Sequence, residues 1–218
     1  MDAGIHKVVS IPVGNGTVEA ELFIPLSAQA IVIFSHGSGS SRFSKRNRMV
    51  AKFLQEKYFG TLLLDLLTEE EDKIYDNRFN IPLLSKRLSG ATEWLEKLPA
   101  AKHCRIGFFG ASTGAASALK AASGMHKIAA VVCRGGRPDL AMNALPKVSA
   151  PTLLIVGSLD ENVLQLNKEA YSQLNCIKKL EVVPGASHLF EEPGTMDIVS
   201  ALAANWFQKY LSGVAIVT

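Results

Sequence analysis

The sequence is poor in cysteine and has no long apolar run. Its three cysteines, Cys104, Cys133 and Cys176, occur without a CxxC pair or a Cys/His spacing, so neither a disulfide framework nor a zinc site is indicated. The N-terminus has no basic segment followed by a long apolar one, and no apolar run reaches the roughly 18 residues of a membrane span. These absences predict a cytoplasmic protein in a reducing compartment, without membrane contact.

The sequence also lacks a large excess of charge of either sign. Its 218 residues carry 23 Lys+Arg against 20 Asp+Glu, which gives a formal net charge of +3. A polyanion is bound through a marked positive excess, so nucleic acid is not an expected partner. No linker rich in proline, glycine or serine divides the chain, which predicts a single domain over residues 1–218 in a monomer or small homo-oligomer.

Eight apolar, β-branched runs predict β-strands. They cover residues 5–13, 18–24, 30–35, 61–67, 104–110, 128–133, 152–157 and 177–183. The turn Gly14-Asn15-Gly16 joins the first two in an antiparallel edge hairpin, whereas the later runs are almost continuously apolar, as in a parallel sheet covered on both faces. Helical periodicity around residues 49–54, 84–98 and 199–210 supplies the covering helices. The predicted class is α/β, with an eight-stranded, mostly parallel sheet.

One hydroxyl stands between two glycines directly after an apolar run, at Ser112 in Gly110-Ala111-Ser112-Thr113-Gly114. A strand-like segment precedes it and a helix of small residues follows, which is the setting of a nucleophile elbow. The glycines would remove bulk where a sharp turn brings strand and helix together. The alternative is that Ser112 only caps the helix and the glycines only serve packing.

A serine hydroxyl becomes a strong nucleophile when a base takes its proton, and the base needs an acid to orient it. Of the five histidines, only His188 follows Ser112 with an aspartate in between, which is the chain order nucleophile, acid, histidine. Asp160 comes just after the predicted strand 152–157, where parallel sheets collect their active sites. Asp139 is the second candidate for the acid and Glu161 the third.

Acyl transfer also needs hydrogen-bond donors where negative charge develops on the substrate oxygen. The backbone amide of Thr113 is one candidate, because it follows the nucleophile. The other is the amide of Ser38, in the loop HGSGSSR after the third predicted strand, where Gly37 and Gly39 let the backbone turn inward. The same loop could be only a flexible connection. No Gly-Lys-Ser/Thr follows, so a nucleotide site is not expected.

Four motifs occur in this order along nearly the whole chain: HGSGSSR, GASTG, GSLDENV and PGASHLF. With them the sequence resembles the α/β-hydrolase superfamily, and within it the small, lidless dienelactone-hydrolase-like proteins. The resemblance implies the α/β-hydrolase fold without a cofactor or metal. Dienelactone hydrolases proper use cysteine where this chain has Ser112, which favours a carboxylesterase-like reaction. Only 18 residues separate Cys133 from Thr152, too few for a cap domain.

Two arginines, Arg42 and Arg134, follow predicted strands on the side of the site, and Arg137 lies close to the second. A guanidinium suits a carboxylate or phosphate, so these arginines are candidates for binding an anionic group of the substrate. The alternative is that they hold loops by pairing with Asp65, Asp139 or backbone carbonyls.

The residues together predict a serine hydrolase that cleaves small esters through an acyl-enzyme, with the triad Ser112, Asp160 and His188. Its partner is then a small-molecule ester. A thioesterase, a lactonase or a small-peptide hydrolase would use the same residues. A protein of another class, a hydrolase-fold binding protein without turnover, would carry the same triad.

Overall fold

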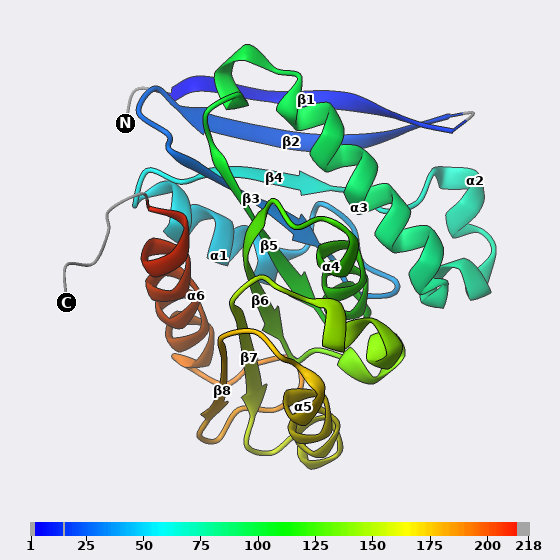
Figure 1. The fold of residues 1–218 in the computed structure, drawn as a ribbon, viewed down its shortest axis with the longest axis vertical. Helices are drawn as coiled ribbons and strands as arrows, with labels where there is room; N and C mark the ends of the chain where they lie inside the picture. The colour runs from blue at the N-terminus through cyan, green and yellow to red at the C-terminus, as the bar shows by residue number, and fades with distance from the viewer. Residues whose placement is uncertain (1–2, 15, 213–218) are drawn as a thin grey trace.

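An eight-stranded sheet forms the centre of the computed structural model, which describes residues 3–14 and 16–212. The strands run in the order β1-β2-β4-β3-β5-β6-β7-β8 (Figure 1). Their bounds are β1 Ala3–Val13, β2 Gly16–Pro25, β3 Ala30–Ser35, β4 Gly60–Leu64, β5 Arg105–Ala111, β6 Ile128–Arg134, β7 Thr152–Gly157 and β8 Lys178–Val183. Strand β2 pairs antiparallel with β1 and β4, and the remaining pairs are parallel. The predicted sheet, with its antiparallel hairpin at one edge, is confirmed.

Helices cover both faces of this sheet. The α-helices are α1 Lys45–Gln55, α2 Glu69–Asp72, α3 Ile81–Glu96, α4 Thr113–Gly124, α5 Glu161–Gln173 and α6 Thr195–Leu211, and the short 3-10 helices are η1 Tyr75–Phe79, η2 Pro99–Ala101 and η3 Pro138–Lys147. Helices α1 and α6 pack on one face, and α3, α4 and α5 lie on the other (Figure 1). The three helices expected from periodicity are present: α1 and α6 extend beyond the predicted segments at both ends, while α3 begins earlier, at Ile81, and ends earlier, at Glu96.

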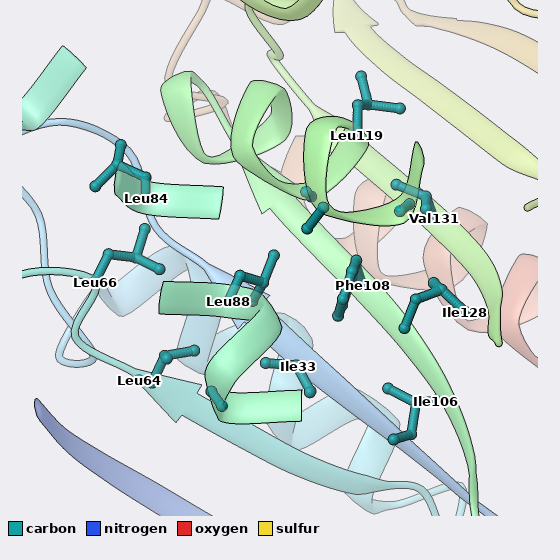
Figure 2. Close-up of a cluster of buried hydrophobic side chains, with 14 of the residues drawn as sticks. Ile33, Leu64, Leu66, Leu84, Leu88, Ile106, Phe108, Leu119, Ile128 and Val131 are labelled. Atoms are coloured by element: carbon teal, nitrogen blue, oxygen red, sulfur yellow. The ribbon is translucent and has the colours of Figure 1, made fainter. Parts of the chain in front are cut away.

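The larger of two apolar cores lies between the sheet and the helices α3 and α4. Figure 2 shows Leu88 and Leu119, from these helices, in one cluster with Ile33 and Phe108 of the sheet. All four side chains are fully buried, and each contributes about 1.5–3 kcal/mol on removal from water. Helix α3 begins where Asn80 accepts a hydrogen bond from the Leu83 amide at 3.1 Å. This core packs against strands β3 and β5. The loop that contains Ser38 follows β3, and the turn at Ser112 follows β5.

Parallel pairing brings the carboxyl ends of the central strands to one edge of the sheet. In register, Ala111 of β5 lies beside Arg134 of β6, and Gly157 of β7 lies beside Val183 of β8. The loops after these strands therefore meet at the same edge, which is where open α/β sheets bind their ligands.

One strand departs from the sequence-based expectations, and the expected lack of a cap domain is confirmed in the described part of the chain. Strand β4 ends at Leu64 rather than at residue 67, because the amide of Leu66 turns out of the sheet to donate a hydrogen bond to the ring of His36. In the described part of the chain, the connection from β6 to β7 holds η3 and no cap domain. Asn15 of the predicted turn and the apolar tail 213–218 lie outside the described residues.

Within the described ranges, no helix is both long and apolar enough to span a membrane.

Candidate active site

Ser112 occupies a sharp turn between β5 and α4. Its backbone has φ 52° and ψ −121°, a left-handed conformation that is costly for a residue with a side chain. A Cβ on Gly114 would stand 2.2 Å from the Ser35 carbonyl oxygen, and one on Gly110 would stand 2.5 Å from the Cα of Ala115. The glycines are thus required by close packing. Ser112 is the N-cap residue of α4, yet its side chain makes no capping hydrogen bond, so the hydroxyl does not serve as the helix cap that the alternative assumed.

Asp160 and His188 are brought together from two loops. The Oδ2 atom of Asp160 lies 2.6 Å from Nδ1 of His188. Asp160 is the N-cap residue of α5 and makes no capping bond, because its carboxylate is turned toward the imidazole. A carboxylate on Nδ1 holds the proton at that nitrogen and leaves Nε2 free to accept another. This geometry is that of a general base with its orienting acid.

The other two candidate acids have different roles in the structure. Asp139 accepts two hydrogen bonds from Arg137, at 2.9 and 2.8 Å. Glu161 begins helix α5, where a carboxylate interacts favourably with the helix dipole. Of the three acids that the sequence offered, Asp160 is the one that the structure joins to His188.

A glycine segment after β6 lies against both Ser112 and His188. The amide of Ser112 donates to the carbonyl of Arg134 at 3.2 Å. The next residue, Gly135, has φ 52°, and a Cβ there would stand 3.2 Å from the His188 carbonyl oxygen. Among the hydrogen bonds of the described residues, none involves Ser112 Oγ. The serine and histidine therefore flank one segment without a direct bond, which is common before substrate binds.

The glycine loop after β3 lies against the nucleophile. A Cβ on Gly37 would stand 3.1 Å from Cβ and 3.8 Å from Oγ of Ser112. The amide of Ser38 donates a hydrogen bond to Oγ1 of Thr113 at 2.8 Å. The two segments that the sequence named for the oxyanion hole are thus adjacent and linked. In the structure the Ser38 amide is bonded to the Thr113 hydroxyl, so it is not free to bind a substrate oxygen.

His36 holds this loop, a role that sequence reasoning missed. Its Nδ1 donates to the Gly37 carbonyl at 2.9 Å, and its Nε2 accepts from the Leu66 amide at 3.1 Å. A neutral imidazole has one donor and one acceptor, and both are used here. Burial lowers the pKa of His36, which keeps the ring neutral. The available signal was its position directly before the glycine loop.

Asn167 is a second residue that the sequence did not single out. It is fully buried on α5 and donates from Nδ2 to the carbonyls of Gly136 at 2.9 Å and Val163 at 2.8 Å. The first of these bonds anchors the glycine segment that lies against His188. Nothing in the sequence pattern distinguished Asn167 from an ordinary helix residue.

The three arginines near the site differ in their partners. Arg42 forms an ion pair with Asp65, whose carboxylate also accepts from the Arg42 amide at 2.7 Å. Arg137 is paired with Asp139. For these two, the expected alternative of a loop-holding pair describes the structure. Arg134 is buried and has no carboxylate partner among the described residues.

Two of the three cysteines, Cys104 and Cys133, do not have the surroundings of reactive thiols. Cys133 is fully buried, and burial raises the pKa of its thiol. Burial also raises the pKa of Cys104. In the described part of the chain, no group of three or more His, Cys, Asp or Glu side chains could hold a metal ion.

The chain matches the model of the dienelactone hydrolase family over residues 18–213. A dienelactone hydrolase from Anabaena variabilis ATCC 29413 has 51% sequence identity to it and a TM-score of 0.92, over 97% of this chain and 100% of that one. The esterase Est1E from Butyrivibrio proteoclasticus has 16% identity and a TM-score of 0.80, over 93% of this chain and 98% of that one. The second likeness concerns the fold alone.

Relatives in Mycobacterium tuberculosis are similar over part of their length. Proteins from two strains are 50% identical over 206 residues, which is 94% of this chain and 46% of each relative. Both have the provisional name of a phosphoribosyl transferase. This chain therefore spans about half the length of these relatives.

Proposed function

Because this chain belongs to the dienelactone hydrolase family, and is thus a hydrolase of that fold, we propose that it cleaves small carboxylic esters with Ser112 as nucleophile. The observation that carries the proposal is the 2.6 Å pairing of Asp160 with His188, together with a strained serine whose side chain makes no capping hydrogen bond. An oriented base near a half-buried hydroxyl on a tight turn is the arrangement that acyl transfer requires.

In the first half of the reaction, Ser112 Oγ attacks the carbonyl carbon of the ester while Nε2 of His188 takes the hydroxyl proton. Asp160 stabilises the imidazolium that forms. The tetrahedral intermediate collapses, its bond to the alcohol oxygen breaks, and His188 returns the proton to the departing alcohol. The acyl group then remains on Ser112 as an ester.

In the second half, water attacks the acyl-enzyme with His188 again as base, which releases the acid and restores the serine. The oxyanion of each intermediate would be held by the Thr113 amide, at the positive end of α4, and by the Ser38 amide once it turns from the Thr113 hydroxyl. One such donor typically contributes about 2.7–4 kcal/mol to transition-state stabilisation.

The same residues could act on more than one kind of acyl donor. A thioester or a lactone would be cleaved by the same steps, and serine in place of cysteine favours the ester. The name of the M. tuberculosis relatives suggests transfer of a phosphoribosyl group instead. In this chain, the elbow and the Asp160–His188 pair support hydrolysis rather than such a transfer.

Covalent labelling with a fluorophosphonate probe, followed by mass mapping of the adduct, tests the nucleophile. We expect one adduct on Ser112, and loss of both label and ester turnover in Ser112→Ala. Ser40→Ala is the matched control, because Ser40 is an exposed serine of the neighbouring loop and should keep both. A panel of esters, thioesters and lactones then identifies the acyl donor. Absence of label and turnover in the unaltered chain would favour a hydrolase-fold binding protein.

A further inference from the structure

The hydroxyl of Thr113 is buried beside the amides proposed for the oxyanion. Thr113 is the first residue of α4, and 3% of it is exposed. Its Oγ1 accepts a hydrogen bond from the Ser38 amide at 2.8 Å. Among the hydrogen bonds of the described residues, none has this hydroxyl as the donor. A hydroxyl offers a proton as well as lone pairs, and here only the lone pairs have a partner in the protein.

Two buried hydroxyls in other helices show how such a proton is normally accepted. Thr92 of α3 donates to the Leu88 carbonyl at 2.8 Å, and Ser200 of α6 donates to the Met196 carbonyl at 2.8 Å. Each acceptor lies one turn earlier in the same helix. Thr113 has no such acceptor, because no helical turn precedes the first residue of α4. Its proton is therefore left for a group outside the helix, and a buried polar group without a partner is unfavourable.

Both amides proposed for the oxyanion are close to this hydroxyl. The Thr113 amide belongs to the same residue, where only Cα and Cβ separate the nitrogen from Oγ1. As the first amide of α4, it has no partner within the helix. The Ser38 amide is bonded to Oγ1, and its loop touches the nucleophile, since a Cβ on Gly37 would stand 3.8 Å from Oγ of Ser112. A substrate oxygen that accepts from both amides therefore lies within reach of the Thr113 hydroxyl.

We propose that the side-chain hydroxyl of Thr113 is a third hydrogen-bond donor to the oxyanion, which makes it a catalytic group in its own right. This rests on the proposed function and adds a group to the same site. As Ser112 Oγ bonds to the carbonyl carbon, the π electron pair of the carbonyl moves to its oxygen. The hydroxyl proton stays on Oγ1 of Thr113 and forms a charge-assisted hydrogen bond to that oxygen. The bond weakens again when the intermediate collapses and the carbonyl returns.

The opposite role for this hydroxyl is that it only blocks the site. Oγ1 of Thr113 occupies the Ser38 amide, so a substrate oxygen has to replace it there. If blocking were its whole effect, removal of the hydroxyl would free the amide and raise the rate. A hydrogen bond to a charged oxygen is roughly twice as strong as one between neutral groups, so loss of the donor outweighs release of the amide. The two roles thus predict changes of opposite sign.

The test compares two substitutions that separate the hydroxyl of Thr113 from its methyl group. Thr113→Val replaces the hydroxyl with a methyl of similar size, and should lower kcat for a neutral 4-nitrophenyl ester about 10²-fold. Thr113→Ser keeps the hydroxyl and should stay within a few-fold of the unaltered chain. KM should change little, because the bond gains its strength only in the transition state. Thr92→Val is the matched control, since it removes a buried hydroxyl from α3, and its kcat should be unchanged.

Binding of an aryl trifluoromethyl ketone reports on the oxyanion without turnover. Ser112 Oγ adds to its carbonyl carbon, His188 takes the hydroxyl proton, and the carbonyl oxygen becomes an oxyanion that persists. Its inhibition constant should rise in Thr113→Val by about the factor by which kcat/KM falls. The corresponding alcohol cannot form the adduct, so its binding should be the same in both proteins. A purely structural role of the side chain would weaken both compounds alike.

The outcomes distinguish this role from the proposed hydrolysis. An unchanged or higher kcat in Thr113→Val, or equal losses in Thr113→Val and Thr113→Ser, would overturn the donor role, while labelling of Ser112 would keep the hydrolysis. Absence of label and turnover in the unaltered chain would overturn the hydrolysis, and the donor role with it. Thr113→Ala, with a smaller side chain, should show the same loss as valine and decides the question if Thr113→Val does not fold.

Discussion

The Oδ2 atom of Asp160 lies 2.6 Å from Nδ1 of His188, although 28 residues separate them in the chain. Asp160→Asn should leave the fold intact and lower kcat for a neutral 4-nitrophenyl ester by about 10⁴-fold, because the amide favours the wrong imidazole tautomer. Asp139→Asn is the control, since that carboxylate pairs with Arg137, and its kcat should stay within a few-fold of the unaltered value. Comparable losses in the two variants would contradict the assignment of Asp160.

The surroundings of two glycines predict opposite effects on stability when each is replaced by alanine. Gly114→Ala would put a Cβ 2.2 Å from the backbone oxygen of Ser35 and should destabilise the chain by more than about 3 kcal/mol, since the backbone cannot yield as a side chain would. Gly90→Ala, in the interior of α3 with no atom within 4 Å, should stabilise it by about 1 kcal/mol. Urea unfolding of both variants measures the difference. A stable Gly114→Ala would show that the turn is not tightly packed.

The burial of Cys133 predicts that its thiol resists alkylation. Cys133 is enclosed and burial raises the pKa of its thiol, so iodoacetamide near neutral pH should leave ester turnover intact, whereas a fluorophosphonate should abolish it. The measurement is residual activity after each reagent, with the alkylated positions mapped by mass. Inactivation that follows modification of a cysteine would argue for a thiol in the reaction.

Sequence patterns predicted the parts of this molecule that depend on local order and on apolar periodicity. The eight strands, the edge hairpin and the helix covering could be inferred because each burial pattern repeats within its own segment. The candidate base followed from chain order, which left one histidine of five. Asp160 could be named because it directly follows a predicted parallel strand, and the carboxyl ends of such strands meet at one edge of the sheet.

What the sequence could not provide is which side chains pair across distant segments. The sequence does not distinguish Arg134 from Arg42 and Arg137. In the folded chain, Arg42 and Arg137 each pair with an aspartate, whereas Arg134 has no carboxylate partner among the described residues. The bond between Ser38 and Thr113 spans 75 residues and occupies an amide that was expected to be free. The hydrogen bond from Leu66 to His36 likewise ended β4 early. Each of these depends on geometry that several elements set together.

The neutral state of His36 predicts a pH dependence of stability. Burial lowers its pKa more strongly than the hydrogen bond to the Gly37 carbonyl and the carboxylates of Asp65 and Asp72 raise it. In the unfolded chain the ring takes up a proton as pH falls through about 6.5, while the folded chain resists protonation. The unfolded state then binds more protons, so the free energy of unfolding decreases as pH falls below about 6.5, by at most ~1.4 kcal/mol per unit.

His36→Gln should remove that contribution and flatten the dependence between about pH 6.5 and the folded pKa of the ring. At about pH 8 the same variant should be less stable by roughly 1–3 kcal/mol, since the buried Leu66 amide loses its acceptor. Its kcat should also fall, because the glycine loop is no longer anchored to Leu66. His103→Gln, at an exposed histidine, is the control for urea unfolding across pH. An unchanged slope in His36→Gln would mean that another group carries the titration, and an unchanged kcat would mean that the loop holds its position without the ring.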